Sequence, residues 1–293
     1  LITTVIGLII TLFFGYTGMG AKRWIRIGGF NLQISEFAKI ALVLFMAKYF
    51  HKLNAEKTIG LLRSILPLII SLIVFILVAI QPDLGTAVII LTLGLIAIFY
   101  AGINLIYPIL SLIILGISSP FLWTLLKPYQ QNRVMIFLNP DLDPLGKGYH
   151  IIQSKIAIGS GGMRGNGFLG GSQSSLDFLP EKETDFVFAI FSEQFGFTGS
   201  MVILGLFLFL FLIPIFKSFF LTQVFNKLIL FVLSFKIFFE FLINISMTIG
   251  LVPVVGVALP FMSYGGSSLL SNMIICALLI NIMSVSEKKR MFS

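Results

Sequence analysis

The sequence has few charged residues and few residues that bind metals. Only 11% of its 293 residues are charged, whereas soluble domains carry about 25%. Its one cysteine, Cys276, cannot form an internal disulfide or a metal site built from several thiolates. The two histidines, His51 and His150, are far apart in sequence and indicate no histidine-based metal cluster. Since 57% of the residues are hydrophobic, the composition indicates a polytopic membrane protein.

Long apolar runs dominate the chain. A membrane-spanning helix needs about 20 residues, with a range of roughly 17 to 25. We therefore expect an all-α polytopic bundle of about eight spans. The runs cover residues 2–16, 36–50, 62–80, 84–101, 103–126, 186–213, 228–252 and 265–285.

One connection, residues 127–185, is much longer than the others. It holds four of the 11 prolines and keeps apolar and aromatic residues throughout, so we expect it to be folded. Within it, "GYHIIQSKIAIGSGG" (148–162) is typical of a short amphipathic helix that ends on glycines. Such a helix is suited to lie along a membrane surface.

The lysines and arginines of the connections predict the orientation. Both sides carry equal raw numbers of these residues, but the rule that cytoplasmic loops are positive applies to short loops. Most of the charges on one side fall in the long 127–185 connection. The pattern therefore predicts a cytoplasmic C-terminus, with the long loop and Asp185 on the outer face of the membrane.

Several ionisable residues lie inside apolar runs, where each costs about 2.5 kcal/mol or more. Glu36 and Lys39 are three residues apart, and Lys236 and Glu240 are four apart, so each pair shares a helix face. Glu193 lies two turns into the sixth run. These residues are candidates for a functional site. A structural ion pair that seals two helices together is the alternative; it is favoured for Lys236 with Glu240, whereas both interpretations stay open for Glu36 with Lys39, which lies near the outer end of its run.

Two aspartates stand at the beginning of apolar runs. Asp185 precedes the sixth run in "FLPEKETDFVFAI", and Asp83 precedes the fourth in "QPDLGTAV". An aspartate at a helix start caps the first turn and is stabilised by the helix dipole, so capping is one interpretation of both. The sequence has no phosphate-binding P-loop, and "GNGFLG" (165–170) lacks the strand that a dinucleotide-binding glycine loop requires.

Five long motifs together resemble the SEDS family of bacterial membrane proteins. They are "GAKRWIRIGGFNLQISEFAKI", "QPDLGTAV", "YQQNRVMIFLNPDLDPLGKGYHIIQSKIAIGSGG", "FLPEKETDFVFAIFSEQFGFTG" and "PVVGVALPFMSYGGSSL". The resemblance covers essentially the whole chain and is stronger to the elongation (RodA) branch than to the division (FtsW) branch. Family members have ten spans, so the resemblance predicts that two spans precede this chain.

The resemblance implies a function. SEDS proteins are peptidoglycan glycosyltransferases of the bacterial cytoplasmic membrane, acting on lipid II during elongation and rod-shape maintenance, with a class B penicillin-binding protein as partner. In the family an aspartate at the position of Asp185 is required for activity. The glutamate and lysine matching Glu36 and Lys39 line the central cavity near it. The chain has Ile34 where family members commonly have proline, which alters a turn but no charge.

The expected reaction assigns roles to these residues. Asp185 is suited to be the base that takes a proton from the attacking sugar hydroxyl. Arg133, Lys155 and Lys39 are suited to meet the negative charge of the departing pyrophosphate, and Glu193 is a further candidate lining residue. A divalent cation, Mg²⁺ or Mn²⁺, is compatible with this chemistry, but the sequence shows no ligand set. A lipid-precursor flippase or transporter, and a non-catalytic scaffold for a transpeptidase, remain alternatives.

Overall fold

A computed structural model covers the whole chain. It describes residues 1–18, 21–28, 30–53, 60–104, 106–126, 128–144, 146–168, 170–171 and 183–291. The chain divides into two compact units, each assembled from segments that are distant in sequence. Unit 1 comprises Leu1–Ile109, Leu210–Phe239 and Gly265–Ser293, and unit 2 comprises Leu110–Phe209 and Glu240–Tyr264.

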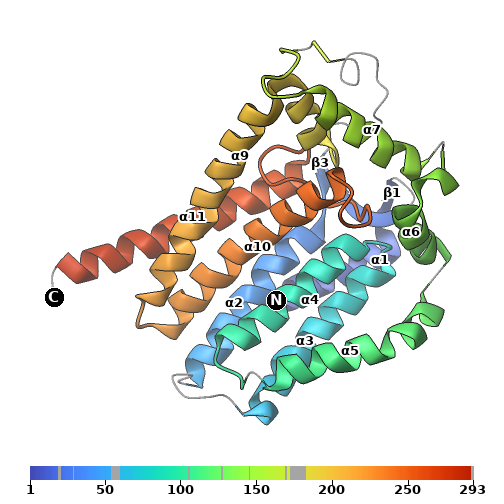
Figure 1. Cartoon of the computed structure of the whole chain (residues 1–293). Helices are drawn as coiled ribbons and strands as arrows, with labels where there is room; N and C mark the ends of the chain where they lie inside the picture. The colour runs from blue at the N-terminus through green and yellow to red at the C-terminus, as the bar shows by residue number, and fades with distance from the viewer. Residues whose placement is uncertain are drawn as a thin grey trace. The chain divides into compact units, whose positions relative to one another are not determined.

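Unit 1 is a bundle of apolar helices. In Figure 1, α3 (Leu61–Ile80) and α4 (Leu84–Tyr100) lie side by side, and α2 (Ile34–Lys52) packs against α4. The approach of α3 to α4 is close, because a side chain at Gly94 would collide with the Ser71 hydroxyl. Small residues at such crossings let helix backbones approach in an apolar environment. The helices of this unit are α1 (Ile2–Phe14), α2 (Ile34–Lys52), α3 (Leu61–Ile80), α4 (Leu84–Tyr100), α11 (Gly266–Met291), and parts of α9 and α10.

A small antiparallel sheet connects α1 to α2, and the sequence did not predict it. Its strands are β1 (Tyr16–Gly18), β2 (Ala21–Ile27) and β3 (Phe30–Leu32), in the order β1-β2-β3. Ile25 pairs with Leu32, and the guanidinium carbon of Arg26 lies 4.8 Å from the centre of the Tyr16 ring. Aromatic and β-branched residues in "WIRI" favour a strand. The fold nevertheless stays dominated by helices.

Unit 2 contains the described parts of the long connection. The amphipathic helix predicted at 148–162 is confirmed as α7 (Lys147–Ser160). The preceding helix, α6 (Pro128–Leu138), was not predicted, since its polar "YQQNR" start gave no apolar run. Residues 172–182 lie outside the described part of the connection. The elements of this unit are most of α5 (Ile106–Leu125), α6 (Pro128–Leu138), the 3₁₀ turn η1 (Pro140–Leu142), α7, and parts of α9 (Val187–Phe219) and α10 (Val224–Thr248).

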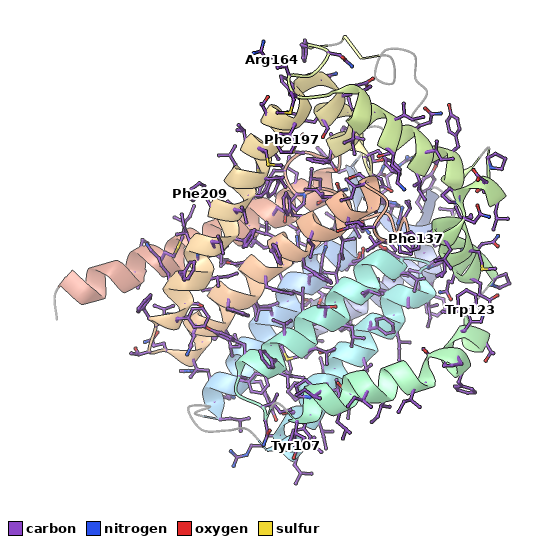
Figure 2. All side chains as sticks on the ribbon, viewed as in Figure 1. Tyr107, Trp123, Phe137, Arg164, Phe197 and Phe209 are labelled. Atoms are coloured by element: carbon purple, nitrogen blue, oxygen red, sulfur yellow. The ribbon has the colours of Figure 1, made fainter. Side chains whose placement is uncertain are left out.

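The helix α9 is broken at Gly196, where φ is 66° and ψ is −163°. The loop after α7 pairs with the break: Phe197 N–H donates to the Gly162 carbonyl oxygen at 2.8 Å. A side chain at Gly196 would collide with the backbone of this loop, and only glycine adopts such a φ without strain. Figure 2 shows Arg164 of the loop and Phe197 near the same end of α9, with Phe209 farther along the helix.

All eight predicted apolar runs coincide with helices, namely α1 to α5 and α9 to α11. Among the described residues, four helices are long and apolar enough to cross a membrane, while α1, α4 and α5 are apolar over shorter stretches. The predicted all-α, polytopic membrane fold is therefore confirmed. The four long stretches are Leu61–Ile80, Val187–Phe219, Val224–Thr248 and Gly266–Val285.

Candidate functional site

Asp185 lies in the turn that leads into α9, and it is half-buried. The next residue, Phe186, is fully buried, and its ring stacks on His150 of α7 with ring centres 5.9 Å apart. Phe186 forms a small core with Ala157 of α7 and Ala189 of α9. Burial of this aromatic ring fixes the start of α9 against α7, so the adjacent carboxylate is carried by a packed segment.

The segment that follows α10 lies directly against Asp185. A Cβ atom built on Gly256 would be 3.5 Å from Oδ2 of Asp185, and Gly256 has φ +72°. Asn244, near the end of α10, is fully buried. Its amide nitrogen donates to the Asp185 carbonyl oxygen at 3.0 Å and to the Val257 carbonyl oxygen at 2.8 Å. Asn244 therefore ties the Asp185 backbone to the same segment that faces its carboxylate.

Two further hydrogen bonds hold the residues before Asp185. The Ser263 hydroxyl donates to the Thr184 carbonyl oxygen and accepts from Leu259 N–H at 2.7 Å. The Tyr264 N–H donates to the Glu183 carbonyl oxygen at 2.8 Å. The carbonyl groups of residues 183, 184 and 185 thus each accept a hydrogen bond from α10 or the segment after it. We call residues 249–264 the α10–α11 loop.

Lys155 is exposed on α7 and lies against the beginning of the α10–α11 loop. A side chain at Gly250, where φ is +75°, would collide with the end of the Lys155 side chain. Beside it, the buried Ser154 hydroxyl donates to the Thr248 carbonyl oxygen at 2.7 Å. One loop therefore contacts both Lys155, through Gly250, and Asp185, through Gly256.

Arg133 and Glu193 lie in the same unit. Arg133 is half-buried on α6. Glu193, on α9, is completely buried, and a side chain at Gly171 would collide with its carboxylate. The Glu193 carbonyl oxygen accepts from Asn166 N–H at 3.0 Å, in the loop that pairs with the α9 break. Glu193 therefore belongs to the structured break of α9, eight residues after Asp185.

Glu36 and Lys39 form a buried ion pair in unit 1. Their exposed fractions are 6% and 1%, and Lys39 Nζ lies 2.7 Å from Glu36 Oε1. The other carboxylate oxygen of Glu36 accepts from the Ser271 hydroxyl of α11 at 3.0 Å. The predicted pairing along one face of α2 is confirmed, and α11 supplies a third member that the sequence did not indicate.

A second buried lysine lies next to this pair. Lys236 of α10 donates to Oδ1 of Asn272 of α11 at 2.6 Å, and both side chains are fully buried. Lys236 also lies close enough to Glu36 for its charge to attract the carboxylate. Glu240, one turn further along α10, is buried too, and its predicted ion pair with Lys236 stays a prediction. Helices α2, α10 and α11 therefore share a polar cluster inside an apolar bundle.

The predicted site residues divide between the two units. Asp185, Arg133, Lys155 and Glu193 belong to unit 2. The Glu36–Lys39 pair belongs to unit 1, so its expected proximity to Asp185 remains an implication of the family resemblance. The capping interpretation of Asp83 is confirmed, since Asp83 Oδ1 accepts from Thr86 N–H at 3.3 Å.

Within the described residues, no three His, Cys, Asp or Glu side chains gather as a metal-binding group. The participation of Mg²⁺ or Mn²⁺ therefore stays a prediction without a ligand set. The sequence did not single out Asn244, Gly256 or Ser263 as site residues. The signals that could have found them were the single asparagine in the apolar run 228–252 and the serine and glycines of "PVVGVALPFMSYGG".

Comparison of the sequence with known proteins identifies relatives of this chain. The family model for FtsW, RodA and SpoVE, described as cell cycle protein, matches residues 1–288. The chain is 38% identical over 281 residues to peptidoglycan glycosyltransferase MrdB of Escherichia coli K12, covering 96% of this chain and 75% of that protein. It is 35% identical to peptidoglycan glycosyltransferase RodA of Treponema pallidum, covering 94% of this chain and 80% of the relative.

Solved structures share the fold. A chain in a peptidoglycan synthase complex, solved to describe the coordination of polymerization and crosslinking, superposes with a TM-score of 0.80 at 31% identity. The superposition covers 96% of this chain and 79% of that one. The rod shape determining protein RodA of Thermus thermophilus superposes with a TM-score of 0.66 at 24% identity, which supports the fold alone.

Proposed function

This chain belongs to the FtsW, RodA and SpoVE family of cell cycle proteins, and from that membership we propose that it is a peptidoglycan glycosyltransferase that polymerises lipid II. Lipid II is a disaccharide-pentapeptide carried on undecaprenyl pyrophosphate. The observation that carries the proposal is the match of nearly the whole chain to MrdB and RodA glycosyltransferases. Asp185, held at the start of α9, supplies a carboxylate suited to the reaction.

In the proposed reaction, a sugar hydroxyl of the acceptor attacks the anomeric carbon of the donor, with inversion. A bond forms between the hydroxyl oxygen and that carbon, and the bond from the carbon to the pyrophosphate oxygen breaks. Asp185 takes the proton of the attacking hydroxyl, which a positioned carboxylate can do. The packed Phe186 beside it supports this role, because a fixed segment holds the base in one place.

Cationic side chains are proposed to meet the charge that develops on the leaving pyrophosphate. Lys155 shares the α10–α11 loop with Asp185 and is exposed, so a ligand can reach it. Arg133 offers a planar fork suited to phosphate oxygens, and Lys39 adds a buried positive charge held by Glu36. Such charges stabilise a transition state in proportion to the negative charge that it gains.

The proposed setting is the bacterial cytoplasmic membrane, with the C-terminus inside and residues 127–185 on the periplasmic side. The proposed partner is a class B penicillin-binding protein of the elongation machinery, which crosslinks the new strands. The solved peptidoglycan synthase complex supports such a partnership, because a chain similar to this one occurs in it. Rod-shape maintenance fits the similarity to MrdB and RodA.

An assay that mixes purified protein with lipid II in detergent and follows glycan strand length tests the proposal. Glycan strands that lengthen with time, without any second compartment, support a glycosyltransferase. Movement of lipid II across vesicle membranes without polymer would instead favour the flippase. Polymer that depends on an added partner but not on Asp185 would favour the scaffold.

A further inference from the structure

We propose that Asn244 and Ser263 are positioning residues that set the location of the Asp185 carboxylate through its backbone. This inference rests on the proposed function, because it assigns their effect to the base. It concerns three hydrogen bonds at one point of the chain. These bonds hold the carbonyl oxygens of Glu183, Thr184 and Asp185 to α10 and the α10–α11 loop.

The geometry of Asn244 is specific. Both groups that face its amide are carbonyl oxygens, of Asp185 at 3.0 Å and Val257 at 2.8 Å. Carbonyl oxygens only accept hydrogen bonds, so the NH₂ group, and not the amide oxygen, must point at them. Because Asn244 is fully buried, shortening its side chain removes the donor that both carbonyl oxygens use. One side chain therefore fixes the distance between Asp185 and the α10–α11 loop.

Ser263 fixes the neighbouring residue. Its hydroxyl donates to the Thr184 carbonyl oxygen while it accepts from Leu259 N–H. Ser263 thus links two residues of the α10–α11 loop and connects the loop to the chain before Asp185. The bond to Thr184 restricts the peptide unit that immediately precedes Asp185, and the bond from Asn244 restricts the one that follows it, so the Asp185 Cα atom has little freedom.

Gly256 brings the loop next to the carboxylate itself. A Cβ atom there would be 3.5 Å from Asp185 Oδ2, which is ordinary van der Waals contact. The α10–α11 loop and the end of α10 therefore hold the backbone of Asp185, and the loop also lies beside its carboxylate. A base held in this way meets its substrate in one orientation, and a displacement of about 1 Å can cost on the order of 100-fold in rate.

The test is the rate of lipid II polymerisation by the full-length purified protein. We expect Ser263→Ala and Asn244→Ala to lower kcat by about 10- to 100-fold, with KM for lipid II changed by less than about 2-fold. Ser263→Thr keeps the hydroxyl and should restore kcat. The matched control is Ser200→Ala, which removes a buried hydroxyl bonded to the Gly196 carbonyl oxygen in the same unit. We expect it to leave kcat unchanged.

Several outcomes would overturn the inference. Normal kcat in both Ser263→Ala and Asn244→Ala, while Asp185→Asn is inactive, would disprove positioning and leave the proposed function intact. A kcat of Ser263→Thr as low as that of Ser263→Ala would also count against it, as would an equal loss in Ser200→Ala. If Asn244→Ala fails to reach the membrane, the comparison of kcat between Ser263→Ala and Ser263→Thr decides whether positioning holds. An active Asp185→Asn would instead refute the base role on which this inference depends.

Discussion

A Cβ atom built on Gly256 would lie in van der Waals contact with the carboxylate of Asp185, 3.5 Å from Oδ2, and the Gly256 backbone has φ +72°. A side chain at this position would be strained, because the left-handed backbone conformation disfavours any residue with a Cβ. The added carbon would also fill the space next to the proposed base, at ordinary van der Waals distance. A change in the backbone conformation of the α10–α11 loop at Gly256 would therefore change the surroundings of the Asp185 carboxylate.

We predict that Gly256→Ala lowers kcat by about 10-fold or more, because it shifts Asp185 or its loop. The measurement is kcat for lipid II polymerisation by purified protein. Gly167→Ala is the matched control, since Gly167 also has positive φ (+87°) but nothing lies within 4 Å of its added Cβ. An equal loss in both variants would show that backbone strain, and not contact with Asp185, causes the effect.

We predict that Lys39→Met destabilises the protein by about 3–5 kcal/mol, because it leaves the buried Glu36 carboxylate without its ion-pair partner. The neighbouring charge of Lys236 offsets a part of this loss. Thermal unfolding in detergent measures the change.

The double variant Glu36→Gln with Lys39→Met removes both charges and should regain most of the lost stability. If the pair acts on the substrate, the double variant stays inactive although it is stable. Recovery of activity together with stability would assign the pair a structural role only.

We predict that Gly196→Ala destabilises the protein by about 1–3 kcal/mol, because φ is +66° and the new carbon would meet the backbone of the 162–167 loop. Gly205→Ala, in a regular part of the same helix with open space around it, should be neutral or stabilising by up to about 1 kcal/mol. The melting temperatures of both variants check this. A Gly196→Ala protein as stable as the wild type would contradict the described break in α9.

The helices were predictable because a helix that spans a membrane needs about 20 mostly apolar residues in a row, so each one is visible as an apolar run. The runs at 62–80 and 228–252, for example, became α3 and α10 with shifts of only a few residues at their ends. The pairing of Glu36 with Lys39 followed from helical spacing alone. Local periodicity carries this information, so no tertiary contact is required.

The parts that escaped prediction depend on contacts between distant residues. Asn244 and Asp185 are 59 positions apart, and only the folded chain brings the amide to the carbonyl. Ser271 reaches Glu36 across 235 positions. The sheet of residues 16–32 was missed because its strands are short and lie between two apolar runs that dominate the pattern. The importance of Asp185 for activity was inferred from the family resemblance, since its position at a helix start also suits a cap.

The most direct test of the account is polymerisation of lipid II by purified Asp185→Asn, which keeps the size of the side chain and removes its basicity. Wild-type protein should form long glycan strands. The variant should form none, while its melting temperature and its level in the membrane match the wild type. Glycan strands of normal length and rate from Asp185→Asn would contradict the account.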